Sequence, residues 1–183
     1  MIDSGIALII FVACLFLSGF FSSSEVALIS LNPAKVRTLV EQKKKGSFAL
    51  ERLKADPDRL LITILIGNNL VNIAAASIAT AVAISIWGEI GVGIATFFTT
   101  LVLLTIGEII PKTYASRSAE QVALLVSRPI LYMSYVLYPL FWIVDIGKKA
   151  FSRERVMRPT VTEDALQYMN SSHSLSRMDG VVQ

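Results

Sequence analysis

The sequence has almost none of the residues from which transition-metal and redox sites are built. It contains one cysteine, Cys14, and one histidine, His173, in 183 residues. Cys14 lies in an apolar run, where a lone thiol usually packs as a small hydrophobe. With no cluster of His or Cys, any metal that the chain binds must be held by oxygen ligands.

Charge is missing from three long stretches. Residues 4–24, 60–88 and 90–107 contain no Asp, Glu, Lys or Arg, and each is near or above the roughly 20 residues that a helix needs to cross a bilayer. A hydrophobic content of 54% and a mean hydropathy of +0.61 are too high for an ordinary soluble domain. No basic segment precedes the first stretch, which is longer than the core of a signal peptide, so we expect it to stay in the mature protein. We therefore predict an all-α membrane protein with three transmembrane helices, over about 4–31, 58–87 and 90–111.

Basic residues gather between the first and second predicted spans. Residues 35–59 include eight Lys or Arg and four Asp or Glu, interleaved with apolar residues. This pattern predicts amphipathic juxtamembrane helices over 33–55 that turn at Gly46 and face solvent and lipid headgroups. Pro33 after Asn32 indicates a helix boundary before this hairpin, and Asp56-Pro57 is expected to begin the second span. All 17 basic residues lie outside the three uncharged stretches and outside the 88–90 turn. The positive-inside rule therefore predicts a multi-pass protein of the cell membrane with its N-terminus outside and its C-terminus in the cytoplasm.

A fourth apolar stretch, 129–144, has only 16 uncharged residues and contains Pro139. If it crossed the membrane, the five basic residues that follow it would lie outside, against the charge rule. We favour a broken helix along the cytoplasmic interface over a fourth span. Juxtamembrane helices over 33–55 and 113–150 then form a belt, residues 1–155 make up the transmembrane domain, and 156–183 form a polar linker.

Polar residues interrupt each span in its cytoplasmic half. Glu108 stands in an otherwise uncharged run, where a carboxylate costs at least about 2.5–3.5 kcal/mol and marks a functional site by default. Residues 4–31 and 60–111 contain no Lys or Arg to pair with it, which favours a bound cation. Pro111 has no N–H and leaves the carbonyl of Gly107 available for a ligand. Hydroxyl, amide, carboxylate and carbonyl oxygens together suit Mg²⁺, Mn²⁺ or Ca²⁺.

The same residue types also have plainer uses. Ser and Asn commonly form hydrogen bonds between membrane helices, worth about 0.6–2 kcal/mol each. Glu25 lies near the inner boundary, where it can pair with Lys35 or Lys112 instead of a metal ion.

Three polar motifs occur in order along the chain: FSSSEVAL at 21–28, GNNLVN at 67–72 and GEIIPK at 107–112. With the basic hairpin between the first two, residues 4–155 resemble the transmembrane domain of the CNNM/CorC family of magnesium transporters. The resemblance implies a homodimer of three-span protomers with a cytoplasmic helix belt. It also implies that Mg²⁺ binds from the inner side for export, coupled to Na⁺ entry. The implied cation site consists of Ser22, Asn68 and Glu108, with Gly107 offering a backbone oxygen and with Ser23, Glu25, Asn69 and Asn72 nearby.

The sequence departs from that family in lacking the tandem cystathionine-β-synthase module that binds ATP. We therefore expect a piece of a longer protein, with no nucleotide and no nucleic acid among its partners. Two other functions stay open: a membrane anchor or scaffold for cytoplasmic domains, and a proton-coupled carrier that uses Glu25 and Glu108. We do not expect an enzyme, because no His or Lys lies within a span to activate the hydroxyls of Ser22, Ser23 or Ser24.

Overall fold

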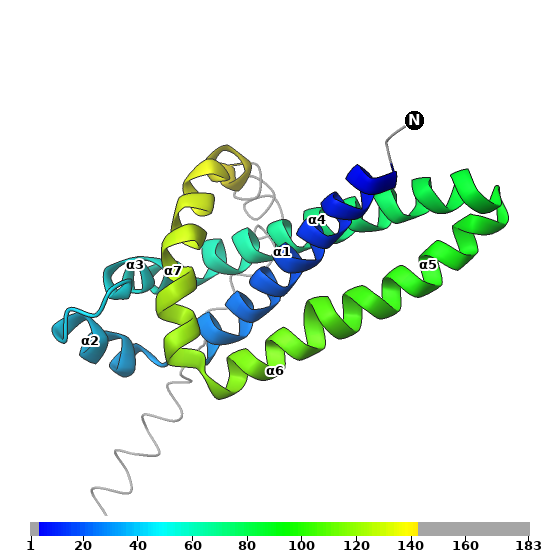
Figure 1. The fold of residues 1–183 in the computed structure, drawn as a ribbon. Helices are drawn as coiled ribbons and strands as arrows, with labels where there is room; N and C mark the ends of the chain where they lie inside the picture. The colour runs from blue at the N-terminus through cyan, green and yellow to red at the C-terminus, as the bar shows by residue number, and fades with distance from the viewer. Residues whose placement is uncertain (1–3, 143–183) are drawn as a thin grey trace, which may run out of the picture. The chain divides into compact units, whose positions relative to one another are not determined.

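The computed structural model describes residues 4–142, and every regular element in that range is helical (Figure 1). The predicted all-α fold is thus confirmed for the described residues. The predicted linker at 156–183 and the end of the 113–150 segment lie outside them. In chain order the elements are α1 (Ser4–Ser30), α2 (Pro33–Glu41), α3 (Ser47–Ala55), α4 (Pro57–Trp87), α5 (Ile90–Val102), a π-helix η1 (Leu103–Ile109), α6 (Ile110–Arg117) and α7 (Ala119–Val136).

Three helical stretches in the described part are long and apolar enough to cross a membrane, as the sequence predicts. They are Gly5–Ser30 in α1, Pro57–Trp87 in α4, and the continuous Ile90–Arg117 formed by α5, η1 and α6. At 1.5 Å per residue, even the shortest of them exceeds the roughly 30 Å of a hydrocarbon core. Only 11% of the most apolar window of α4 is buried inside the protein. Many of its large apolar side chains, such as those of Leu65, Leu70 and Ile73, are therefore exposed, as expected of a helix surrounded by lipid.

Two helices begin with the same device, an Asx side chain followed by proline. The side chain of Asn32 accepts a hydrogen bond from the backbone N–H of Lys35 at 2.7 Å, and Pro33 opens α2. Asp56 does the same for α4, accepting from the N–H of Arg59 at 3.2 Å. Both arrangements satisfy an N–H that has no partner within its own helix. The helix starts expected from the Asn-Pro and Asp-Pro pairs are therefore confirmed.

Helix α1 is the centre of the packing. It contacts α4 on one side and η1 and α6 on the other, and α7 packs against its C-terminal part. The main apolar core is built from residues of α1, α2, α3, α4, α6 and α7, and its fully buried side chains include Leu28, Leu39, Leu50 and Ile130. The short helices are thus built into the same core as the spans.

Polar contacts attach the hairpin of α2 and α3 to α7. Gly46, before α3, has φ +95°, a left-handed conformation that suits glycine. The hydroxyl of the buried Ser127 donates to the Gly46 carbonyl oxygen at 3.0 Å. The Glu120 carboxylate lies 2.6 Å from Nζ of Lys44 and 2.9 Å from Nζ of Lys35. The hydrogen bond from Lys44, followed by that from Lys35, holds the pKa of the Glu120 carboxyl below its ordinary value of 4.5. That carboxylate therefore joins α7 to the hairpin.

The apolar stretch that begins at Pro129 forms a broken helix, as predicted. Pro129 lies inside α7, the helix ends in a turn at Leu137, and residues 138–142 are helical again. Pro139 explains the break, because it cannot donate to a carbonyl in the preceding turn. The guanidinium of Arg59 lies 5.4 Å from the ring centre of Tyr138 and 5.6 Å from that of Phe141, which connects this segment to the start of α4. The placement of α7 along a membrane surface, as part of a belt, stays a prediction.

Candidate functional site

The third span changes its helical form where the GEIIPK motif begins. Between α5 and α6, residues Leu103–Ile109 form a π-helix, in which the N–H of Ile110 bonds to the carbonyl of Thr105 five residues back. Such segments are rare in proteins and occur frequently at functional sites. This one contains both Gly107 and Glu108.

Close approaches at two glycines bring η1 and α4 against α1. A Cβ added to Gly107 would lie 2.8 Å from the hydroxyl oxygen of Ser18, and one added to Gly67 would lie 3.0 Å from Cδ1 of Phe21, with two further ring carbons closer still. Neither place has room for a side chain. The absence of one therefore sets the spacing of the three helices at this level.

The same contacts place the three motifs side by side. Phe21 on α1 meets Gly67 on the antiparallel α4, so Ser18, one turn earlier on α1, lies near the level of residues 70–71. From α4, the amide nitrogen of Asn72 donates to the Glu108 carboxylate on η1 at 3.2 Å. The hydroxyl of Ser18 donates to the Gly107 carbonyl at a long 3.5 Å. The contacts of α1 with α4 and of α4 with η1 therefore join residues of the motifs, while Ser18, just before the first motif, joins α1 to η1.

Three buried oxygen atoms in this region have no hydrogen-bond partner in the protein. They are the hydroxyl oxygen of Ser22 and the amide oxygens of Asn68 and Asn72. A buried polar atom without a partner costs free energy and requires an explanation, such as a water molecule or an ion. Ser22 is fully buried, and α1 and α4 contribute all three atoms.

The electrostatics of the region are dominated by Glu108. In the described part of the chain, Asn72 is its hydrogen-bond partner and no ion pair forms with it. Lys112, one turn further along, pairs with Glu25 at 3.1 Å instead. Within residues 4–142 there is also no group of three or more His, Cys, Asp and Glu that could hold a metal. One carboxylate among hydroxyl, amide and carbonyl oxygens suits a hard cation.

Three residues that were expected near the site, Ser23, Glu25 and Asn69, have other partners or are exposed. The hydroxyls of Ser23 and Ser24 donate to the carbonyl of Phe20 in their own helix, at 3.0 and 2.6 Å. Asn69 is exposed, about 100° around α4 from Asn68. Glu25 forms the ion pair with Lys112 that the sequence left open as an alternative to a metal.

One residue of the region was missed from the sequence. Ser18 is fully buried and contacts the Gly107 carbonyl, the backbone oxygen that Pro111 was expected to leave available. The signal for it was its position four residues before Ser22, on the same face of α1.

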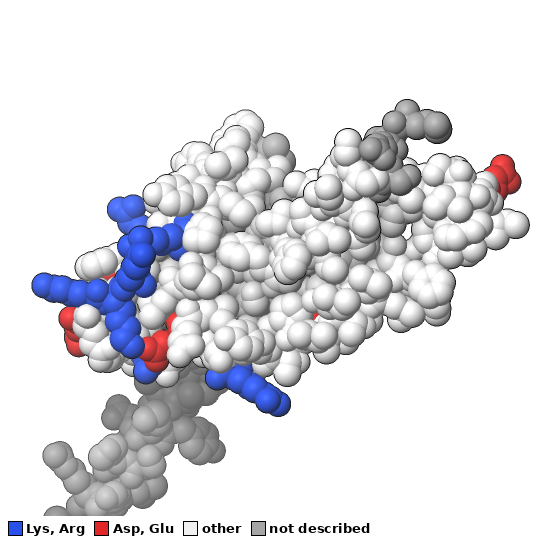
Figure 2. All heavy atoms as spheres, in the orientation of Figure 1, with Lys and Arg blue, Asp and Glu red and all other residues white. Residues whose placement is uncertain are grey.

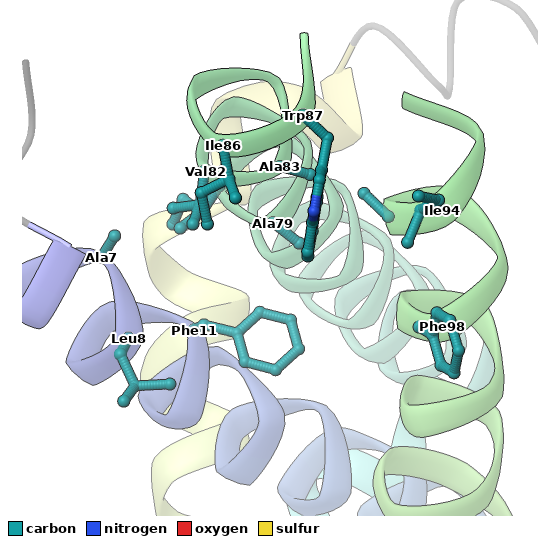
Figure 3. A pocket seen from close by; sticks show the side chains of 12 residues that line it. Ala7, Leu8, Phe11, Ala79, Val82, Ala83, Ile86, Trp87, Ile94 and Phe98 are labelled. Atoms are coloured by element: carbon teal, nitrogen blue, oxygen red, sulfur yellow. The ribbon is translucent and has the colours of Figure 1, made fainter. Parts of the chain in front are cut away.

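A hollow of about 590 Å³ lies toward the other end of the same helices. Its lining comes from α1, α4 and α5 and is apolar, with the rings of Phe11, Trp87 and Phe98 around it (Figure 3). Since it offers no oxygen ligand or charge, it does not fit a cation.

Comparison with known proteins gives one family match over most of the chain. The model of the Cyclin M transmembrane N-terminal domain, CNNM, matches residues 9–182. A UPF0053 protein of Haemophilus influenzae is 45% identical over 78% of this chain and 34% of its own length. A chloroplastic DUF21 domain-containing protein of Arabidopsis thaliana is 40% identical over 87% of this chain and 25% of its own length. The UPF0053 inner membrane protein YfjD of Escherichia coli is 37% identical over 70% of this chain and 30% of its own length. The chain thus spans about a quarter to a third of the length of these curated relatives.

Proposed function

Because this chain belongs to the CNNM transmembrane domain family, we propose that it is the membrane domain of a magnesium transporter. In this proposal it exports Mg²⁺ from the cytoplasm, coupled to Na⁺ entry, and works as a homodimer. The N-terminus lies outside, as the distribution of basic residues predicts. The inner-membrane name of the Escherichia coli relative supports placement in a bacterial-type cell membrane.

The observation that carries the proposal is the set of unpartnered oxygens beside an unpaired carboxylate. Ser22, Asn68 and Asn72 each contribute a buried oxygen with no partner, and Glu108 lies within hydrogen-bond distance of Asn72. A cation bound among them would satisfy the orphaned atoms and compensate the carboxylate. Both features cost free energy in an empty site.

Each group has a distinct part in the proposed site. Glu108 supplies the negative charge, while Ser22, Asn68 and Asn72 supply neutral oxygens. The Gly107 carbonyl becomes a further ligand when the long hydrogen bond from Ser18 breaks. Mg²⁺ demands near-octahedral geometry and dehydrates reluctantly, so a mixed set that leaves places for water molecules favours its capture and release.

The test is Glu108→Gln, which keeps the size and removes the charge. We expect Mg²⁺ flux in proteoliposomes to fall at least about tenfold, because a loss of about 1.4 kcal/mol or more in cation binding gives that factor. The matched control is Glu89→Gln, in the exposed turn before α5, which should transport normally. Both variants should elute as the wild type does on gel filtration. Wild-type flux through Glu108→Gln would refute the site.

Membrane anchoring is a second candidate, favoured by one observation. The chain makes up only 25–34% of the three relatives compared above, so most of their length lies outside the matched segment. An anchor needs the spans but no cation site. Calorimetry that detects no heat of binding at millimolar Mg²⁺ would favour the anchor, whereas flux driven by a pH gradient without Na⁺ would indicate a proton-coupled carrier.

A further inference from the structure

A hollow of about 380 Å³ lies between α3 and α7, apart from the cation site. Four residues of α3 and three of α7 line it: Phe48, Ala49, Glu51, Arg52, Arg128, Leu131 and Tyr132. A smaller hollow of about 150 Å³ shares Arg52 and Leu131 with it and continues along the same seam toward Arg59. The two hollows are thus lined mainly by arginine and by aromatic or aliphatic side chains, together with the carboxylates of Glu51 and Asp56.

The two arginines of the larger hollow have no carboxylate partner in residues 4–142. Four other basic side chains at this end form ion pairs: Arg59 with Asp56, Lys112 with Glu25, and both Lys35 and Lys44 with Glu120. Arg37, outside the hollow, forms none of these ion pairs. Arg52 instead donates to the hydroxyl of Tyr135 at 3.1 Å, which fixes its direction and leaves its other N–H groups available. Arg128 is exposed. Two guanidinium groups that line one hollow without an acid partner complement a phosphate.

The surroundings of the hollow are apolar and face outward. Phe48 is 64% exposed and Tyr132 is 72% exposed, and Leu125 and Val136 continue the apolar surface along α7. Figure 2 shows Lys and Arg side chains gathered over the end of the protein that carries α2 and α3. Helix α3 ends at Ala55 and α4, a span, begins at Pro57. Exposed aromatic residues and arginines next to the end of a span are typical of the headgroup level of a membrane.

We propose that the hollow between α3 and α7 binds the phosphodiester head of an anionic phospholipid from the inner leaflet. Arg52 and Arg128 bind the phosphate oxygens, and Phe48 and Tyr132 pack against the glycerol and the first acyl methylenes. A lipid fits better than a free phosphate because only a lipid also covers the exposed apolar side chains. Glu51 lines the same hollow and opposes the bound anion, so it lowers the affinity.

Four variants of the full chain test this proposal, each incorporated in vesicles of phosphatidylcholine with or without phosphatidylglycerol. The measurement is the phosphatidylglycerol concentration that half-saturates thermal stabilisation. Arg52→Gln and Arg128→Gln should each raise it about fivefold, the factor given by about 1 kcal/mol per basic residue at an anionic surface. Glu51→Gln should lower it. Arg37→Gln, an exposed arginine of α2 outside the hollow, should leave it unchanged.

Because Arg128 has no partner in the described structure, its substitution does not endanger folding, and it remains informative if Arg52→Gln is unstable. An equal effect of Arg37→Gln would mean general surface charge and would overturn the site. Equal stabilisation by phosphatidylcholine, or by soluble glycerol phosphate, would also overturn the proposal of an anionic lipid. None of these outcomes depends on transport, so the proposal stands or falls separately from the cation site.

Discussion

Gly67→Ala is expected to separate α1 from α4 and to disable the cation site without changing any proposed ligand. The added Cβ would lie 3.0 Å from Cδ1 of Phe21 and closer to two other ring carbons, whereas carbon atoms pack at about 3.5–4.0 Å. The helices must therefore move apart by roughly 1 Å. The ring cannot swing aside easily, since Phe21 is only 3% exposed. Ser22 and Asn68 directly follow the two clashing residues and must move with them.

The expected loss of stability follows from two opposing terms. Overpacking of a close contact costs about 1–3 kcal/mol, while replacing a helical glycine with alanine contributes up to about 1 kcal/mol. A net loss of about 1–2 kcal/mol remains. Gly93→Ala is the matched control, because a Cβ there meets nothing within 4 Å. It has the same stabilisation from replacing a helical glycine with alanine, but no clash.

The two variants are compared by thermal unfolding in detergent and by Mg²⁺ flux in proteoliposomes. Gly67→Ala should melt below Gly93→Ala and lose most of its flux, and Phe21→Leu in the same chain should restore part of both by making room. If Gly67→Ala melted and transported like Gly93→Ala, the close contact would not set the spacing of the site. That result would refute the reasoning from backbone approach to ligand geometry.

Three further predictions concern single side chains. Asn72→Ala removes a hydrogen bond to the carboxylate in the site, worth about 1.5–3 kcal/mol, so Mg²⁺ affinity measured by calorimetry should fall at least tenfold. Unchanged affinity would exclude Asn72 from the site. The control is the same substitution at the exposed Asn69. Asn32→Ala should lower the free energy of unfolding by about 0.5–2 kcal/mol through loss of the α2 cap, and chemical unfolding that shows no loss would contradict this. The pKa of the Glu120 carboxyl is lower in the folded protein than in the unfolded chain. Its ion pairs therefore stabilise the folded state fully above the unfolded-state pKa, and this stabilisation is lost as the pH falls through the lower folded-state pKa. The difference in melting temperature between wild type and Glu120→Gln should therefore be present at pH 7 and vanish well below pH 4.5; a difference that persists in acid would rule out the ion pairs.

Local chemistry made much of the fold predictable. Long uncharged runs indicated the three spans, and proline after Asn32 and Asp56 indicated two helix starts, because both signals act within a few residues. Pro139 indicated the break in the last apolar stretch for the same reason. None of these inferences required knowledge of which helices touch.

The details of the candidate site depend on tertiary distances and were less accessible. The sequence pointed to Glu108 because an unpaired carboxylate in an apolar run is conspicuous at any position. It did not reveal that Ser18 occupies the Gly107 carbonyl or that Lys112, rather than a metal or Lys35, is the partner of Glu25. Those outcomes depend on the packing of α1 against η1 and α6, which no pattern within one helix encodes. The role of each proposed ligand stays a prediction until the cation is measured.

The π-helix also divides the third span into two halves that are out of phase with each other. Because a π turn holds one residue more than an α turn, the residues after η1 are rotated by about 100° from where an uninterrupted α-helix would put them. The first half, α5, can therefore keep its apolar side chains facing outward while Glu108 turns to Asn72. An α-helical wheel drawn through the whole span would assign the two halves to the wrong relative faces. A relative without the additional residue of η1 would present a different side chain to α4, even if its sequence before and after η1 were identical to this one.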